Sequence, residues 1–340
     1  MQVDRIDEAP DAPPWHGAEL FERPDWRVEL TALERTELAH LLDGQAGRPA
    51  GSEPDLRAAP ALADRLRRLG RSLETGCGVA LVRGLPTGSD DGGLARALWI
   101  LGSGFGTPLS QGADGRRLLA VQDAGYAPSD PRFRGPYSAR RLAFHTDRCD
   151  VIGFACVRPA REGGENHLLH ARALRDALRR EAPGSARVLE RDALPYLRHT
   201  VDGGNERPFT RVPVFTETDG RFAGSLLRVL IDRADRSPDA PDLADEQRRA
   251  LDDLERVAED ERLYARIRLE AGDVLFLNNW ITFHRRTAFT DAEEPSERRK
   301  LHRIWISSRY SRAVDPRFGE HFGATGAGAL RGGMRPSARD

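Results

Sequence analysis

The chain contains 340 residues (37.7 kDa), of which 39% are hydrophobic and 31% are charged. This is enough apolar material for a sizeable core, which excludes a wholly disordered protein, and the length suits one decorated β-barrel or sandwich domain. Lysine and arginine together number 52 against 53 aspartates and glutamates. This balance argues against a protein that binds nucleic acid or an anionic membrane surface.

Side chains for several common chemistries are scarce. Lys300 is the only lysine, which argues against Schiff-base, pyridoxal-phosphate and P-loop chemistry, since each needs its own placed amine. The three cysteines, Cys77, Cys149 and Cys156, include no CxxC pair, which argues against a cysteine zinc site and favours a reduced, cytoplasmic protein. We find neither a secretory signal nor an apolar run of about 20 residues, so we expect no membrane span.

Three regions are expected along the chain. Residues 1–25 are acidic and rich in proline, which predicts a loosely held arm, and residues 323–340 predict a tail rich in glycine and arginine. No interior stretch has the composition of a linker, and no repeat is found. Residues 26–322 are therefore expected to form a single domain.

Apolar periodicity predicts helices in the first third of the chain, with one strand among them. The predicted helices occupy residues 30–42, 62–73 and 94–100, and the strand occupies residues 78–85. Leucines at helical spacing mark each helix, and Gly76 is expected to end the second one.

From residue 118 onward the pattern changes to short β-prone runs separated by glycine, proline, aspartate and asparagine. The predicted strands are residues 118–121, 142–147, 151–157, 226–231, 273–278 and 301–307. Two amphipathic helices, at 171–178 and 243–257, interrupt them. Many short strands with uneven insertions predict a mainly β fold, an antiparallel jelly roll (double-stranded β-helix) with flanking helices, and not a regular βαβ alternation.

The phrase Phe144-His145-Thr146-Asp147 concentrates the candidate chemistry. On a strand, residues two apart point to the same face, so His145 and Asp147 would lie side by side at the mouth of the barrel. An imidazole and a carboxylate are two of the three ligands of the facial triad used for non-haem Fe(II). Because such a tripeptide also occurs for structural reasons, the interpretation depends on a third ligand.

His284 is the candidate third ligand, because it follows a strongly apolar predicted strand. A lone histidine in that place is more often a packing or surface residue, but the next strand favours a ligand. Arg299 and Arg303 would share a strand face with Leu301 and Trp305. Two inward guanidiniums are costly to bury without anions, and a dicarboxylate would pair with them through bidentate hydrogen bonds.

The order of four motifs is specific. FHTD, then GGEN, then GDVLFLNN with a histidine and RTAF after it, then RKLHRIW resembles the taurine dioxygenase/2,4-dichlorophenoxyacetate dioxygenase (TauD/TfdA) family, a branch of the clavaminate-synthase-like oxygenases. The resemblance covers about residues 76–335. It implies an enzyme that uses Fe(II), 2-oxoglutarate and O2 to hydroxylate, desaturate or cyclise a small polar metabolite, such as an amino acid or natural-product precursor.

Carried over residue by residue, the resemblance makes His145, Asp147 and His284 the iron ligands. Arg299 matches the arginine that pairs with the far carboxylate of 2-oxoglutarate. Arg303 matches a second arginine near the other carboxylate or the prime substrate. Where the family often has threonine or serine, this chain has Asn166, whose amide would donate to the cosubstrate.

Other residues beside the motifs carry expectations of their own. Phe144 and Trp280 would wall a substrate pocket or simply pack. We interpret His167 and His170 as exposed imidazoles at the start of a helix, and Cys149 as a small buried core residue.

Two alternatives stay open at the level of the sequence. One is an oxygenase that acts on a protein-bound or carrier-bound residue. The other is a catalytically inactive jelly roll that binds a metabolite or partner, whose signature would be the loss of a metal ligand, whereas all three are present. We expect a small anionic or zwitterionic substrate, because charge not used on the cosubstrate at Arg303 would be costly to bury unpaired.

Overall fold

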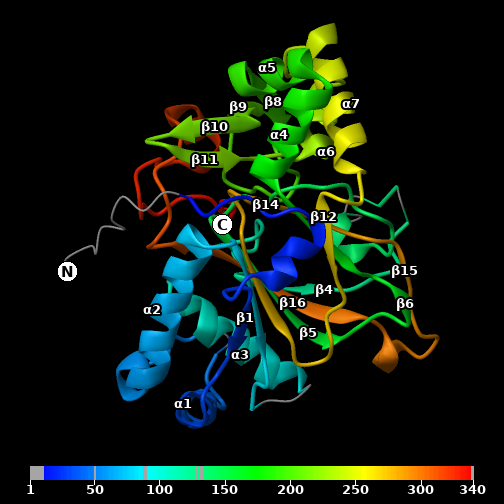
Figure 1. Ribbon diagram of the computed structural model, residues 1–340. Helices are drawn as coiled ribbons and strands as arrows, with labels where there is room; N and C mark the ends of the chain where they lie inside the picture. The colour runs from blue at the N-terminus through cyan, green and yellow to red at the C-terminus, as the bar shows by residue number, and fades with distance from the viewer. Residues whose placement is uncertain (1–10, 50, 87–89, 128, 131–133, 338–340) are drawn as a thin grey trace.

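The computed structural model describes residues 11–49, 51–86, 90–127, 129–130 and 134–337. Two sheets face each other in the middle of the molecule (Figure 1), one large and one small. Three early helices cover the outer face of the large sheet, and a second group of helices and short hairpins lies at one end. This arrangement agrees with the expected mainly β jelly roll with flanking helices. Within the described residues, no helix is both long and apolar enough to cross a membrane.

The main sheet contains seven strands in the order β1-β2-β13-β5-β16-β3, and β4 pairs with β16 beside this path. Their bounds are β1 Arg27–Glu29, β2 Val79–Arg83, β3 Gly106–Pro108, β4 Leu118–Val121, β5 Val151–Arg158, β13 Val274–Asn278 and β16 Lys300–Ser308. Only β1 and β2 run parallel. Both faces of β5 and β13 are buried, because helices cover one face and the small sheet faces the other.

The helices on the outer face are α1 (Ala32–Gly44), α2 (Pro60–Thr75) and α3 (Asp91–Ser103). They confirm the three early helices expected from leucine spacing. Thr31 begins α1 with a reciprocal pair of hydrogen bonds, in which its hydroxyl accepts from the Glu34 N–H and the Glu34 carboxylate accepts from the Thr31 N–H. Their leucines pack on the outer face of the main sheet, so the inner face is left for the small sheet.

The small sheet has the order β12-β7-β14. Its strands are β7 Asn166–His170, β12 Tyr264–Ile267 and β14 Thr282–Arg286. Beyond the paired ends of β7 and β14, β6 Glu162–Gly163 pairs with β15 Phe289–Thr290 in the same register. Leu168 and Ala265 from this sheet share a buried apolar cluster with Ile152 and Leu275 of the main sheet. The two sheets therefore enclose a core between them.

The group at the other end combines four helices with two hairpins. It comprises α4 Ala171–Glu181, α5 Pro183–Arg191, β8 Ala193–Leu197, β9 Phe209–Pro213, β10 Phe215–Thr218, β11 Arg221–Gly224, α6 Arg228–Ala234 and α7 Asp245–Ala258. Helices α4 and α7 confirm the two amphipathic helices expected there. The group forms its own apolar cluster, which extends to Phe283 of the small sheet and to Phe144.

Two expected strands are wrong. Residues 226–231 are not a strand, because Leu230, Ile231 and Ala234 are buried together on one side of helix α6, a spacing of 3.6 and not of 2. The segment 142–147 forms no ladder. It makes one isolated bridge, between His145 and His284, and then crosses to Leu226, which accepts a hydrogen bond from the Thr146 N–H.

Both chain ends that the structure describes pack on the domain. Trp15 is buried and its indole N–H donates to the Cys77 carbonyl at 2.9 Å, and Leu20 is fully buried in a 3₁₀ helix. The expectation of a loosely held arm is therefore wrong for residues 11–25, while residues 1–10 lie outside the described residues. In the expected tail, Arg331 is buried and donates from Nε to the Asp150 carboxylate at 2.6 Å. The last three residues, 338–340, also lie outside the described residues.

The sequence predicted that His167 and His170 are exposed, and this is wrong. Both lie on β7 and are buried. His167 stacks on Tyr264, and His170 accepts a hydrogen bond from the Arg172 N–H at the start of α4. Cys149 is fully buried in the core, as expected.

Burial of His170 predicts acid sensitivity of the metal-free protein. Burial, followed by nearby guanidiniums such as Arg312, lowers the pKa of His170 from 6.5 to about 3. Between these values the unfolded chain binds more protons than the folded one, so the free energy of unfolding falls as the pH drops, by up to about 1.4 kcal/mol per unit. We expect His170→Asn, which keeps an acceptor for the Arg172 N–H, to flatten this dependence in denaturant titrations at pH 7.5, 6 and 5. An unchanged slope in the variant would assign the acid sensitivity to other groups.

Candidate active site

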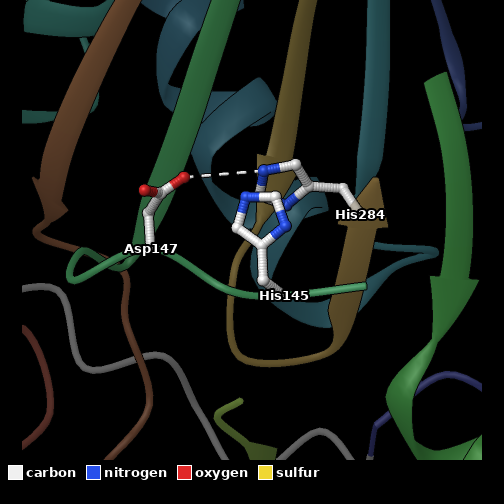
Figure 2. A group of neighbouring side chains, drawn as sticks. All are labelled: His145, Asp147 and His284. Atoms are coloured by element: carbon white, nitrogen blue, oxygen red, sulfur yellow. Dashed lines mark ion pairs between the residues drawn. The ribbon is translucent and has the colours of Figure 1, made fainter. Parts of the chain in front are cut away.

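Three side chains converge where β14 meets the segment before β5. Figure 2 shows His145, Asp147 and His284 turned toward one another. One ligand atom from each lies within 4.8 Å of the other two, His284 Nε2 is 3.5 Å from Asp147 Oδ2, and the two imidazole centres are 4.4 Å apart. The bridge between His145 and His284 fixes the two backbones against each other. The predicted triad is thus brought together by a crossing segment and one strand, and not by two residues of one pleat.

The protonation of His145 suits a metal ligand. Its Nδ1 lies 2.8 Å from the Ala143 carbonyl, and because that oxygen can only accept, the proton stays on Nδ1 and Nε2 keeps its lone pair. Burial, followed by the neighbouring His284, lowers the pKa of His145 to about 4. The imidazole is therefore neutral at physiological pH, which is the form that coordinates metals.

Asp147 is an ionised carboxylate with one oxygen free of hydrogen bonds to the described residues. Burial alone would raise its pKa, but Arg303, followed by His284 and His145, lowers the pKa well below the ordinary value for aspartate. Its Oδ2 is buried and accepts no hydrogen bond from any described residue. An ionised oxygen without a hydrogen-bond donor, facing an imidazole nitrogen, is a suitable place for a cation.

Asn279 holds the backbone of this segment. Its side-chain oxygen accepts from the Asp147 N–H at 3.0 Å, and its amide donates to the carbonyls of Asp147 and Cys149. Because Asn279 directly follows β13, the loop that carries Asp147 is fixed to the end of a central strand. The position of the carboxylate therefore depends on a residue 132 positions away in the sequence.

Arg299 is a buried guanidinium that forms no ion pair with any described residue. It is 3% exposed, its Nη1 has no hydrogen-bond partner among the described residues, and its guanidinium lies 5.0 Å from the ring centre of Phe289. Burial lowers the pKa of Arg299 to about 10, and only Cys156 and Asp291 oppose that effect. A buried charge that stays protonated at neutral pH is costly unless an anion joins it.

Arg303, four residues further along β16, has partners. Its Nε donates to the Gln111 side-chain oxygen at 2.8 Å, and its Nη1 lies 3.5 Å from Asp147 Oδ1. Gln111 in turn donates to the Arg303 carbonyl at 3.0 Å. Arg299, Leu301, Arg303 and Trp305 all border one cavity, as their expected common strand face predicts. Arg303 thus belongs to the triad end of the cavity, whereas Arg299 lies just before β16, beyond a register shift between Lys300 and Leu301.

The cavity that joins these groups measures about 430 Å³ and lies between the two sheets and the helical group. This volume is in the range of sites for small molecules. Phe144 lines it, with the Arg285 guanidinium 4.3 Å from its ring centre. Trp280 does not line it. That indole is 1% exposed, packs on Phe322, and donates to Asp150 at 2.8 Å, so its role is in the core.

Comparison with known families decides the identity. The family model described as "Taurine catabolism dioxygenase TauD, TfdA family" matches residues 41–305. The chain belongs to the TauD/TfdA family. It is thereby a member of a dioxygenase family, as the motif order suggested, and the two-sheet architecture is the fold of that family.

Two curated proteins are relatives of this TauD/TfdA member. FR-33289 synthase of Streptomyces rubellomurinus (strain ATCC 31215) is 27% identical over 346 residues, covering 96% of this chain and 95% of the relative. Uridine-5'-phosphate dioxygenase of a Streptomyces species is 34% identical over 137 residues, covering 40% of this chain and 48% of that protein.

Solved structures share the fold. Asparagine oxygenase in complex with Fe(II), 2S,3S-3-hydroxyasparagine and succinate aligns with a TM-score of 0.64 at 18% identity, covering 83% of this chain and 93% of that one. The non-heme iron oxygenase OrfP in complex with Fe and alpha-ketoglutaric acid aligns with a TM-score of 0.60 at 17% identity, covering 83% and 94%. These alignments confirm the expected jelly-roll fold class.

The GGEN motif of the family member supports the Arg299 end of the cavity. Gly163 and Gly164 both have φ near +69°, and a Cβ on Gly164 would stand 3.3 Å from Arg299 Nε. Asn166 follows on β7, opposite Arg286 of β14, and lines the cavity. The motif therefore places an amide side chain on the wall that Arg299 also borders.

Sequence reasoning missed several residues around this site. Asn279 holds Asp147 and Gln111 holds Arg303, both from distant positions in the sequence. The pair of asparagines after an apolar strand was a signal for Asn279, whereas no pattern marked Gln111. His199, Arg134 and Arg233 also line the cavity. They come from two loops and a helix with no motif, so no pattern in the sequence marks them.

Proposed function

We propose that this TauD/TfdA-family protein is an Fe(II)- and 2-oxoglutarate-dependent oxygenase that hydroxylates a small anionic or zwitterionic metabolite, with desaturation or cyclisation as the related outcomes. The observation that carries the proposal is one cavity with a His-Asp-His cluster at one end and an anion-free buried arginine at the other. Family membership supports the iron, the cosubstrate and O2.

The cluster fits a divalent iron ion. His145 would ligate through the Nε2 lone pair that its Nδ1 contact leaves free, and Asp147 through the oxygen that lacks a donor. His284 completes a set of two imidazoles and one carboxylate on one side of the ion, which leaves positions open for cosubstrate and O2. Two histidines and one carboxylate are the typical ligands of non-haem Fe(II), whereas other metals are typically held by thiolates or by oxygen ligands alone.

The cosubstrate would bridge the cavity. Arg299 would pair with its far carboxylate through two parallel hydrogen bonds, a geometry that the planar guanidinium favours. Arg303, which already contacts Asp147, would lie near the carboxylate at the iron end, and the Asn166 amide would donate to the same molecule. Each of these groups borders the cavity.

Bound Fe(II) and 2-oxoglutarate would supply the oxidation of a substrate C–H bond by O2, with succinate and CO2 as coproducts. The protein's own residues set the geometry of that reaction. Asn279 and the Ala143 carbonyl hold the Asp147 loop and the His145 ring in place. Phe144, Leu301 and Trp305 line the same space with apolar surface, which limits water around the reacting groups.

Names of relatives support a small-molecule substrate. Asparagine oxygenase was solved with a hydroxylated amino acid, and uridine-5'-phosphate dioxygenase is named for a phosphate ester. Both compounds are polar and carry an anionic group. Together with the cavity volume, they favour a free metabolite over a protein-bound or carrier-bound residue as the substrate of this chain.

The test is an anaerobic titration of the purified protein with Fe(II) and then 2-oxoglutarate. We expect the weak visible charge-transfer band of the iron–2-oxoglutarate chelate, followed by succinate release on exposure to O2. A panel of amino acids, sulfonates, aryloxyacetates and nucleoside phosphates, with esters or amides as neutral partners, would then be scored for stimulated succinate release. Absence of the chelate band with a folded protein would overturn the proposal.

A further inference from the structure

The cavity carries far more positive than negative charge. Among its described lining residues, eleven are arginines, whereas the acidic ones are Asp147 and Asp202. Asp147 belongs to the candidate metal cluster. Asp202 is saturated, since Arg148 donates to it at 2.9 Å and the Arg335 N–H donates to it at 2.8 Å. The cavity wall thus offers no free carboxylate to a ligand cation.

Many of these arginines already have carboxylate partners. The ion-paired ones are Arg141 and Arg285 with Glu259, Arg148 with Asp202, Arg207 with Glu320, Arg228 with Asp232, and Arg303 with Asp147. Arg286 donates to backbone carbonyls of Ser138 and Arg140, close to Arg299, and Arg198 is exposed and donates to the Asn205 carbonyl. These arginines therefore need no further anion, apart from the 2-oxoglutarate end around Arg299.

Two half-buried cavity arginines lack any such partner. Within the described chain, the guanidinium of Arg233 on α6 makes no hydrogen bond or ion pair, and that of Arg134 has only the Tyr137 ring and hydroxyl beside it. Both guanidiniums border the cavity, so their charge is available to a ligand. A cation that has lost part of its hydration without gaining a counterion favours anion binding.

His199 lines the same cavity as these two arginines. Burial, then Arg134, Arg233 and Arg303 in that order, lower the pKa of His199 to about 4. Its Nδ1 accepts from the Val201 N–H at 3.3 Å, which leaves Nε2 as an N–H donor. The Asp202 N–H donates to the His199 carbonyl at 3.0 Å, and the Asp202 carboxylate pairs with Arg148, which directly follows Asp147, so His199 lies on the side of the cavity near the triad.

We propose that Arg134, His199 and Arg233 form a second anion site in the cavity, which binds a phosphate or phosphonate group of the prime substrate. The proposal rests on the proposed oxygenase function and names its substrate class. Two unpaired guanidiniums and an N–H donor match a tetrahedral dianion with three acceptor oxygens better than a single carboxylate. An amino acid bound at this site would place its ammonium group beside Arg134 and Arg233, and the described cavity wall offers no free carboxylate to pair with that ammonium.

The test uses the anaerobic Fe(II)–2-oxoglutarate complex, in which the Arg299 end is already filled. Methyl phosphate, methylphosphonate, methanesulfonate and acetate are titrated separately, with binding followed by calorimetry and by the chelate band. We expect the two phosphorus compounds to bind more tightly than acetate. Arg134→Gln and Arg233→Gln should each weaken them by about ten- to a hundredfold, the effect of one lost hydrogen bond to a charged group.

The matched control is Arg207→Gln, since Arg207 also borders the cavity but is already paired with Glu320 at 3.1 Å. It should leave probe binding unchanged, and all three variants should keep the 2-oxoglutarate affinity and melting temperature of the parent. Tighter binding of methyl phosphate points to phosphate esters, and tighter binding of methylphosphonate to phosphonates. Equal probe affinity in the Arg134→Gln/Arg233→Gln double variant, or acetate binding as tightly as the phosphorus probes, would overturn the second site. Failure of the parent to form the chelate would count against the oxygenase function instead.

Discussion

Replacing Asp147 with alanine should abolish Fe(II) binding and, with it, succinate formation. The substitution removes the only carboxylate of the cluster, one whose free oxygen is buried without a hydrogen-bond donor. Loss of an outer-shell partner of a metal ligand already costs about 10–100-fold in metal affinity, so loss of the ligand itself should exceed about 100-fold. Equilibrium dialysis against Fe(II) under anaerobic conditions measures this directly, and oxygen consumption reports the activity.

Asp147 also contacts Arg303, so alanine leaves that guanidinium without its carboxylate. Asp147→Asn separates the two effects, because it keeps the shape and a hydrogen-bond acceptor but not the charge. We expect it to fold like the parent and still lose iron. Glu259→Gln is the control, since it removes a carboxylate outside the cluster. Full oxygen consumption in either Asp147 variant would show that the triad is assigned wrongly.

The convergence of the three candidate ligands could be predicted from the sequence, but the local structure that brings them together could not. His145 and Asp147 were expected to converge through the pleat of a strand. They converge instead because one backbone bridge to His284 and the Asn279 amide hold an irregular segment. Motif order identified the three residues that the structure brings together, whereas the local geometry arises from contacts across more than 130 positions.

Arg299 and Arg303 show the opposite case. Their four-residue spacing on a long apolar strand predicted a common face, and both line the cavity. The difference between them could not be predicted, because it depends on Gln111, which reaches Arg303 from 192 positions away. The pattern within one strand predicts which face a side chain points to. The partner of each charged side chain depends instead on which loops the fold brings close to that strand.

The cluster of Arg134, His199 and Arg233 could not be predicted from the sequence, because the fold brings these residues together from separate segments. Arg134, His199 and Arg233 lie before a short 3₁₀ helix, in the β8–β9 loop and on α6. Residues 226–231 were expected to be a strand, and that expectation did not include Arg233, which lies near the end of α6. The chain has 51 arginines. Apart from Arg299, the other cavity arginines differ from Arg134 and Arg233 only in having a carboxylate or carbonyl partner, which the sequence does not show.

Replacing Arg299 with alanine should weaken 2-oxoglutarate binding by about 2–5 kcal/mol, on the order of 30- to 4,000-fold, with Fe(II) binding retained. The guanidinium is buried with a free Nη1 and lies just before β16, four residues from Arg303 at the triad end, so Arg303 cannot take its place without moving. Arg299→Lys should fall between alanine and the parent, because an ammonium keeps the charge but cannot form two parallel hydrogen bonds. Anaerobic titration of the chelate band gives the dissociation constant of each variant.

Arg298→Ala is the matched control for this substitution, because Arg298 is the adjacent arginine but is exposed and donates only to the Glu293 carbonyl. It should leave the 2-oxoglutarate affinity unchanged. The Arg299 variants should also lose selectivity for length, since a shorter dicarboxylate such as oxalate touches the iron end alone and does not reach Arg299. Oxalate affinity that falls as far as 2-oxoglutarate affinity would mean that alanine disturbs the metal end. A 2-oxoglutarate affinity equal to that of the parent would place the anchor on another cavity cation, with Arg286 as the nearest one, since its guanidinium shares the Phe289 ring with Arg299.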